Sequence, residues 1–128
     1  MIVDTSAVVA IVLEEPGYEV MLQKLLAARS KGIGTPTLLE ACLVLAPRMR
    51  PGSVQVLDGF LRRLHVEPIA FTESHWRAAA EASLRFGKGR HPAALNFGDC
   101  LTYAVAKVAG MPLLFIGRDF AQTDLTPA

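Results

Sequence analysis

The first 13 residues, MIVDTSAVVAIVL, join a short apolar run that ends at Asp4 to a second apolar run that starts at Ala7. Thr5 and Ser6 separate the two runs, so the segment predicts a strand, a turn and a helix. A strand that leads directly into a helix is half of a βαβ unit, from which parallel sheets are built. The N-terminus therefore predicts an α/β fold.

The rest of the chain continues this alternation. Apolar runs predict further strands at 32–34, 66–70 and 113–116. Apolar residues at helical spacing predict helices over 7–13, from 18, from 35 or 36, over 54–64, from 72 to 87 and from the residue after Gly98 to Gly110. Apolar strands separated by helices favour a short parallel sheet covered on both faces, a three-layer α/β/α sandwich. With 128 residues, the chain is expected to form a single domain, 1–128.

The composition narrows the class of protein. No stretch approaches the roughly 20 apolar residues that cross a bilayer, and the N-terminus lacks the basic start of a secretory signal, so we expect a cytoplasmic protein without a membrane span. Cys42 and Cys100 lie far apart among apolar residues and are expected to be buried free thiols. A net charge of +1 does not by itself point to nucleic acid.

Four acidic residues occur where the predicted fold places the carboxyl edge of its sheet. Asp4 ends the first strand, and Asp119 follows the strand at 113–116. Glu40 and Asp99 lie in the first turns of two helices, and helices that leave or precede parallel strands in this way start at that same edge. We therefore expect all four carboxylates to face one crevice.

Each acid also has a purely structural explanation. Asp4, Asp99 and Asp119 are suited to cap or begin a helix, and Thr37 with Glu40 matches the T-x-x-E capping box. The four acids together are not explained by capping alone, because like charges about 4 Å apart repel by roughly 4 kcal/mol per pair at an effective dielectric constant near 20. Such a cluster needs cations to neutralise it. A cluster of carboxylates without nearby Cys or His selects Mg²⁺ or Mn²⁺.

Metal-bound carboxylates at a strand edge are typical of phosphodiester hydrolysis, in which an ion activates water and stabilises charge on the phosphate. The segment before Asp99 carries three cations, Arg85, Lys88 and Arg90, which we expect to border this edge and to contact RNA phosphates. The alternative for this short charge run is a solvated loop.

Four blocks of the chain resemble the PIN-domain family: VDTSA at 3–7, TLLEA at 37–41, GKGRHPAALNFGDC at 87–100 and IGRDFAQTDL at 116–125. The last two are especially similar to VapC toxins of bacterial toxin–antitoxin pairs. The resemblance implies a metal-dependent endoribonuclease whose catalytic and metal-binding acids are Asp4, Glu40, Asp99 and Asp119. It adds Asp124 as a further candidate acid and Thr5 or Ser6 as polar support. Arg118 stands where many relatives have Asn, which leaves the role of the fourth acid open.

The resemblance also implies partners: a homodimer, a cognate antitoxin whose tail enters the active-site groove, and structured or translation-related RNA as substrate. The composition agrees with an apolar face, since 52% of the residues are hydrophobic. We expect this face on the early helices, either at Tyr18, Met21 and Leu25 or at Leu57 and Leu61.

Two other functions compete with this interpretation. A noncatalytic RNA- or protein-binding module on the same fold would have no use for four converging acids and would be indifferent to Mg²⁺. A phosphoacceptor receiver domain would need an acidic pair after the first strand and a Lys after the last. Here Asp4 stands alone and Gly117, Arg118 and Asp119 follow the last strand, which argues against a receiver domain.

Overall fold

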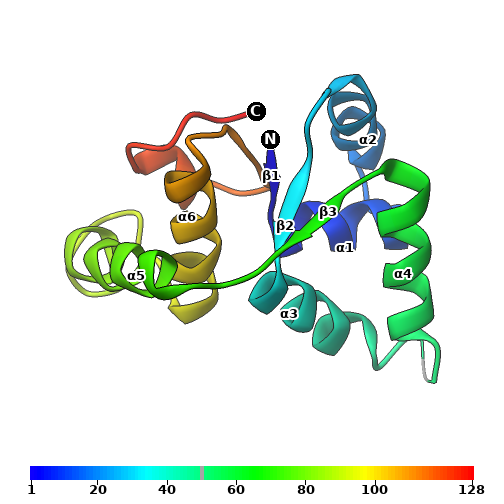
Figure 1. The fold of residues 1–128 in the computed structure, drawn as a ribbon, viewed down its shortest axis with the longest axis horizontal. Helices are drawn as coiled ribbons and strands as arrows, with labels where there is room; N and C mark the ends of the chain where they lie inside the picture. The colour runs from blue at the N-terminus through cyan, green and yellow to red at the C-terminus, as the bar shows by residue number, and fades with distance from the viewer. Residues whose placement is uncertain (50) are drawn as a thin grey trace.

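A parallel four-stranded sheet forms the centre of the protein (Figure 1). The structure, a computed structural model, describes residues 1–49 and 51–128. The strands are β1 (Ile2–Val3), β2 (Gly32–Gly34), β3 (Glu67–Ile69) and β4 (Leu113–Leu114), in the spatial order β3-β2-β1-β4. Every neighbouring pair is parallel, as predicted, although β3 and β4 are shorter than the runs at 66–70 and 113–116.

Helices cover both faces of this sheet. They are α1 (Thr5–Leu13), α2 (Tyr18–Ala27), α3 (Thr35–Leu45), α4 (Ser53–Leu64), α5 (Glu73–Phe86) and α6 (Phe97–Ala109), and the short 3-10 helix η1 (Phe120–Gln122) follows β4. In Figure 1, α5 and α6 lie on one side of the strands, and α1, α2 and α4 lie on the other. The three-layer α/β/α prediction is therefore confirmed.

Alternating side chains of the short strands explain the two covered faces. Ile2 and Leu113 belong to the core cluster that contains α5 and α6. Val3, Ile33 and Leu114 belong to the cluster that contains α1, α2 and α4, and α3 contributes to the same cluster. All five side chains are at most 1% exposed. Successive residues of a strand point to opposite faces, so even a two-residue strand supplies both cores.

The residues expected to form exposed apolar faces on the early helices are instead buried or half-buried, so that prediction is wrong. Leu25 and Leu57 are 0% and 5% exposed, and Met21 and Leu61 pack against the same core cluster. Exposed large apolar side chains occur on α3, α5 and α6, and include Leu39, Leu43, Trp76, Leu84 and Phe97, while Val20 and Leu26 of α2 and Val54 of α4 are exposed as well. The helical spacing correctly identified apolar faces, but these faces pack against neighbouring helices of the same chain and not against a partner.

Two simpler predictions were tested by the structure. Both cysteines are free thiols, as expected, but only Cys100 is buried and Cys42 is half-buried. In the part of the chain that the structure describes, no helix has the length and apolar character needed to cross a membrane.

Helix α6 starts at Phe97, whereas the sequence predicted a start after Gly98, so Gly98 lies inside the helix. The Asn96 side chain accepts a hydrogen bond from the Asp99 backbone N–H at 2.9 Å, and the Asp99 carboxylate accepts one from the Asn96 N–H at 3.0 Å. This reciprocal capping box satisfies two N–H groups that a helix start leaves without partners. Asn96, and not Gly98, therefore marks the boundary.

Candidate active site

The strand order creates a crevice at the carboxyl edge of the sheet. The chain leaves β1 towards β2 on one side, whereas β4 lies on the other side of β1. The segments that follow β1 and β4 therefore diverge, and ligands of parallel α/β sheets bind at such points. A hydrogen bond spans the crevice here, because the backbone N–H of Ile116 after β4 donates to Ser6 Oγ on α1 at 3.0 Å.

Asp4, which directly follows β1, caps α1 and is only 7% exposed. Its Oδ2 accepts hydrogen bonds from the Ser6 N–H at 3.0 Å and from Ser6 Oγ at 2.6 Å. The capping explanation for Asp4 is therefore correct, but both of these bonds use the same oxygen. The second carboxylate oxygen remains available for a cation.

Glu40 has a different role from the capping box suggested by its sequence. Helix α3 starts at Thr35 with Gly34 as its cap, so Thr37 lies inside the helix. The Thr37 hydroxyl pairs with the Thr102 hydroxyl of α6 at 3.0 Å, and Glu40 Oε2 accepts a hydrogen bond from Thr5 Oγ1 at 2.8 Å. The capping explanation is wrong for Glu40, whose carboxylate points to the start of α1.

Asp99 shows the electrostatic cost of gathering these acids. Its pKa is raised to about 6, chiefly by burial; the hydrogen bond from the Asn96 N–H opposes this rise, and the negative charges of Asp4, Asp119 and Glu40 add to it. All four predicted acids are thus close enough for their charges to interact. An ion with positive charge would relieve this repulsion.

Three of the four acids line one pocket of about 290 Å³: Asp4, Glu40 and Asp99. Thr5, Ser6 and Ile116 line it as well. Asp119 is not among the lining residues, although its charge acts on Asp99.

Glu15 also lines the acidic pocket, and the sequence analysis missed it. Helix α1 ends at Leu13, and Glu14 caps it in the left-handed conformation with φ of 52°. The run Glu14-Glu15-Pro16-Gly17 looks like an ordinary helix end, so no local signal places Glu15 beside the other acids.

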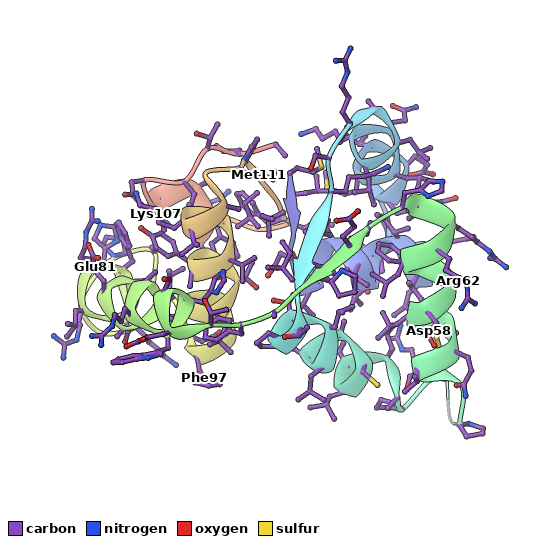
Figure 2. All side chains as sticks on the ribbon, in the orientation of Figure 1. Asp58, Arg62, Glu81, Phe97, Lys107 and Met111 are labelled. Carbon is purple, nitrogen blue, oxygen red and sulfur yellow. The ribbon has the colours of Figure 1, made fainter. Side chains whose placement is uncertain are left out.

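Asp124, the further candidate acid, lies away from this pocket. It accepts hydrogen bonds from the Tyr103 hydroxyl at 2.7 Å and from Lys107 Nζ at 2.8 Å. Lys107 lies two turns along α6 from Asp99, about 12 Å at the usual rise, and Figure 2 shows it at the end of α6 opposite Phe97. Burial raises the pKa of Asp124, but the hydrogen bonds from Lys107 and Tyr103 outweigh it and hold that pKa below its usual value.

The basic segment is also placed differently from the prediction. Arg85 lies 3.5 Å from Glu81 and 3.6 Å from Asp124, so the expectation that it borders the acidic pocket is wrong. Lys88 and Arg90 are exposed in the loop between α5 and α6, and neither lines the pocket. Arg85 instead helps to fasten the C-terminal segment to α5.

The donor set of the pocket suits a hard divalent cation. Its charged ligands are carboxylates, and the three histidines lie elsewhere, with His75 buried and bonded to the Thr72 backbone. Within residues 1–49 and 51–128, no three His, Cys, Asp or Glu side chains converge into a preformed cage. Mg²⁺ does not need one, since it usually keeps several waters and is bound through one or two carboxylates. The residues therefore fit such an ion.

Comparisons with known proteins agree with this geometry. The family model of the PIN domain matches residues 1–125. Ribonuclease VapC36 of Mycobacterium tuberculosis is 45% identical over 126 residues, which are 98% of this chain and 91% of that protein.

Two solved structures share the fold. The M. tuberculosis toxin VapC20, which cleaves the Sarcin-Ricin loop, superposes with a TM-score of 0.77 at 17% identity and covers 99% of this chain and 97% of its own. A chain of a toxin–antitoxin complex from Klebsiella pneumoniae gives a TM-score of 0.71 at 15% identity over 96% of this chain and 92% of its own.

Proposed function

This chain belongs to the PIN-domain family and, within it, to the VapC ribonucleases of toxin–antitoxin systems, and we propose that it hydrolyses RNA phosphodiester bonds with Mg²⁺ or Mn²⁺ at its acidic pocket. The metal-binding and catalytic acids in this proposal are Asp4, Glu40, Asp99 and Asp119. The observation that best supports it is that Asp4, Glu40 and Asp99, which come from separate parts of the chain, line one pocket, while the charge of Asp119 acts on Asp99.

The residues of the pocket prepare it for a cation. Ser6 fixes Asp4 through one carboxylate oxygen, and Thr5 fixes Glu40 in the same way. Asp99 is ionised above its pKa of about 6 and then adds a third negative charge at the pocket. When bound, Mg²⁺ or Mn²⁺ supplies an activated water and positive charge for the phosphate oxygens. Asp119 contributes to the negative potential from the loop after β4.

Substrate contacts outside the pocket are assigned to the basic segment before α6. Lys88 and Arg90 are the stronger candidates for RNA phosphates, because both are exposed. Arg85 already forms ion pairs with Glu81 and Asp124, so its charge is partly neutralised and attracts a phosphate less strongly. Such contacts would act on RNA affinity across sequences and less on chemistry.

The proposal includes two partners. The relatives by fold include a chain of the toxin–antitoxin complex from Klebsiella pneumoniae, which supports a cognate antitoxin for this chain. The exposed apolar side chains of α3, α5 and α6 support a homodimer. We place the protein in the cytoplasm, where its RNA substrate would be.

The direct test is to incubate the purified chain with total RNA, with and without Mg²⁺ or Mn²⁺, and to map the new RNA ends. Cleavage should require the metal and should be lost in Asp4→Asn and Asp99→Asn, because each change removes a charge but keeps the shape. Asp124→Asn is the matched control and should cleave like the wild type, since Asp124 lies with Lys107 and Tyr103. Metal-independent RNA binding without cleavage would favour the noncatalytic module instead.

A further inference from the structure

The carboxylate of Glu40 packs against the first turn of α6 at Gly98. A Cβ atom built on Gly98 would lie 2.7 Å from Glu40 Oε1, 2.9 Å from Oε2 and 3.0 Å from Cδ. Real Cβ atoms essentially never approach another heavy atom within 3.0 Å. The carboxylate therefore occupies the space that any other residue at position 98 would need.

The same carboxylate is also held by Thr5. Its hydroxyl donates to Glu40 Oε2 at 2.8 Å and lies 3.5 Å from the Thr37 carbonyl oxygen. Thr5 is 8% exposed, so its hydroxyl has little freedom to turn away. Glu40 is thus confined between the first turns of α1 and α6, the helices that begin beside Asp4 and Asp99.

Backbone conformation does not account for a glycine at position 98. Gly98 lies inside α6 and does not have a positive φ, so an alanine could adopt the same backbone. Alanine is also the better helix former, and a glycine in a helix lowers stability. What glycine provides at this position is the empty space that the Glu40 carboxylate fills.

We propose that Gly98 is a positioning residue that sets where Glu40 presents its carboxylate, and so sets the affinity of the pocket for Mg²⁺ or Mn²⁺. This inference rests on the proposed function. The obstacle to a Cβ is the far end of a flexible side chain and not backbone, so Gly98→Ala should fold normally. The carboxylate should move instead and lose its hydrogen bond from Thr5.

The test measures Mg²⁺ and Mn²⁺ binding to the purified chain without RNA, by calorimetry, together with thermal unfolding in EDTA. We expect Gly98→Ala to melt no lower than the wild type but to bind either metal about tenfold more weakly, the usual size of effect when a ligand loses its supporting contacts. Gly59→Ala is the matched control. Gly59 lies inside α4 with nothing within 4 Å of a built Cβ, so its replacement should leave metal affinity unchanged.

A second comparison asks whether the effect acts through Glu40. Glu40→Asp shortens the side chain, so its carboxylate should no longer reach the space of the added Cβ. Adding Gly98→Ala to Glu40→Asp should then change metal affinity less than twofold. An equal loss in both backgrounds would overturn the inference, as would a marked loss of thermal stability in Gly98→Ala.

The proposed function and this inference can fail separately. A wild type that binds Mg²⁺ but cleaves no RNA would contradict the proposed function, and the comparison of metal affinities would still decide the role of Gly98. A wild type that binds metal and cleaves RNA, with a Gly98→Ala variant that does both equally well, would overturn the inference alone. A wild type that binds neither ion would contradict both.

Discussion

At the scale of single residues, Asp99 and Asp124 have opposite electrostatic environments, although Asp99 lies in α6 and Asp124 is bonded to the same helix. Burial and three neighbouring acids raise the pKa of Asp99 to about 6, whereas Lys107 and Tyr103 outweigh burial and lower the pKa of Asp124. A carboxyl group with a raised pKa opposes folding once it is ionised, and one with a lowered pKa favours it. The two residues should therefore respond to pH and to neutralisation with opposite signs.

For Asp99, protonation favours the folded chain. Its contribution to stability is fully present below the unfolded pKa of 3.8 and is lost as the pH rises through about 6. In the absence of metal, Asp99→Asn removes the ionisable group that destabilises the folded chain, so the free energy of unfolding at pH 7.5 should rise. Partial exposure to solvent limits the gain to about 1 kcal/mol. Urea unfolding in EDTA at pH 4.5 and 7.5 measures it.

Asp124→Asn is the control for that experiment and should lower stability at pH 7.5, because it removes a carboxylate held by Lys107 and Tyr103. In Asp99→Asn, the amide oxygen of the new side chain can still accept the capping hydrogen bond from the Asn96 N–H, so a large loss of stability is not expected. Such a loss would mean that the main role of Asp99 is to cap α6 and not to bind a metal.

At the scale of elements, one buried contact links the two helices that carry Glu40 and Asp99. Thr37 of α3 and Thr102 of α6 are 2% and 0% exposed, and their hydroxyls pair at 3.0 Å. Each lies three residues from its acid, on the neighbouring turn of the same helix face. The pair therefore fixes the two helices close to the point where their acids meet.

We predict that Thr37→Val lowers the free energy of unfolding by about 1–3 kcal/mol, because it leaves the Thr102 hydroxyl buried without its partner. The double variant Thr37→Val with Thr102→Val should recover most of this loss, since two apolar groups of the same shape replace the pair. Urea unfolding of the four proteins forms a double-mutant cycle. Additive losses in the double variant would show that the hydroxyls do not depend on each other.

The elements and the acidic edge were predictable because local rules determine them. Apolar runs located the strands, and the rule that helices begin at the carboxyl edge was enough to place Asp4, Glu40 and Asp99 together from sequence alone. The Thr37–Thr102 pair and the contact between Gly98 and Glu40 were not predictable. Both depend on how closely α3 and α6 approach, and hydrophobic spacing carries no information about that distance.

The irregular ends of elements caused the other errors. The segment after η1 has no periodicity, so nothing in it indicated that Asp124 pairs with Lys107 and Tyr103, away from Asp99. Arg85 was placed near the pocket from its separation in sequence, whereas its contact with Asp124 draws it to the other end of α6. Separation along a loop limits a distance but does not give a direction.

At the scale of the whole molecule, several exposed apolar side chains of α3 and α6 lie beside the candidate site. Phe97, Leu39 and Leu43 are 82%, 61% and 65% exposed, and Figure 2 shows Phe97 projecting from the end of α6. Two hollows, of about 500 and 370 Å³, flank the Phe97 and Leu101 side chains. In a two-fold symmetric dimer, the projecting side chain of each copy can fill the hollow of the other copy, because both copies use the same surface.

We therefore predict a homodimer through this face, formed by α3, α5 and α6. Leu43→Lys should shift the protein to monomers at micromolar concentration, because it places a charge in the apolar hollow lined by Leu39 and Phe97. Val54→Lys is the matched control, since Val54 is 55% exposed on α4 and should tolerate the charge without a change of assembly. Sedimentation velocity distinguishes these outcomes. A monomeric wild type would contradict the homodimer itself, whereas a Leu43→Lys variant that stays dimeric would place the interface on another face.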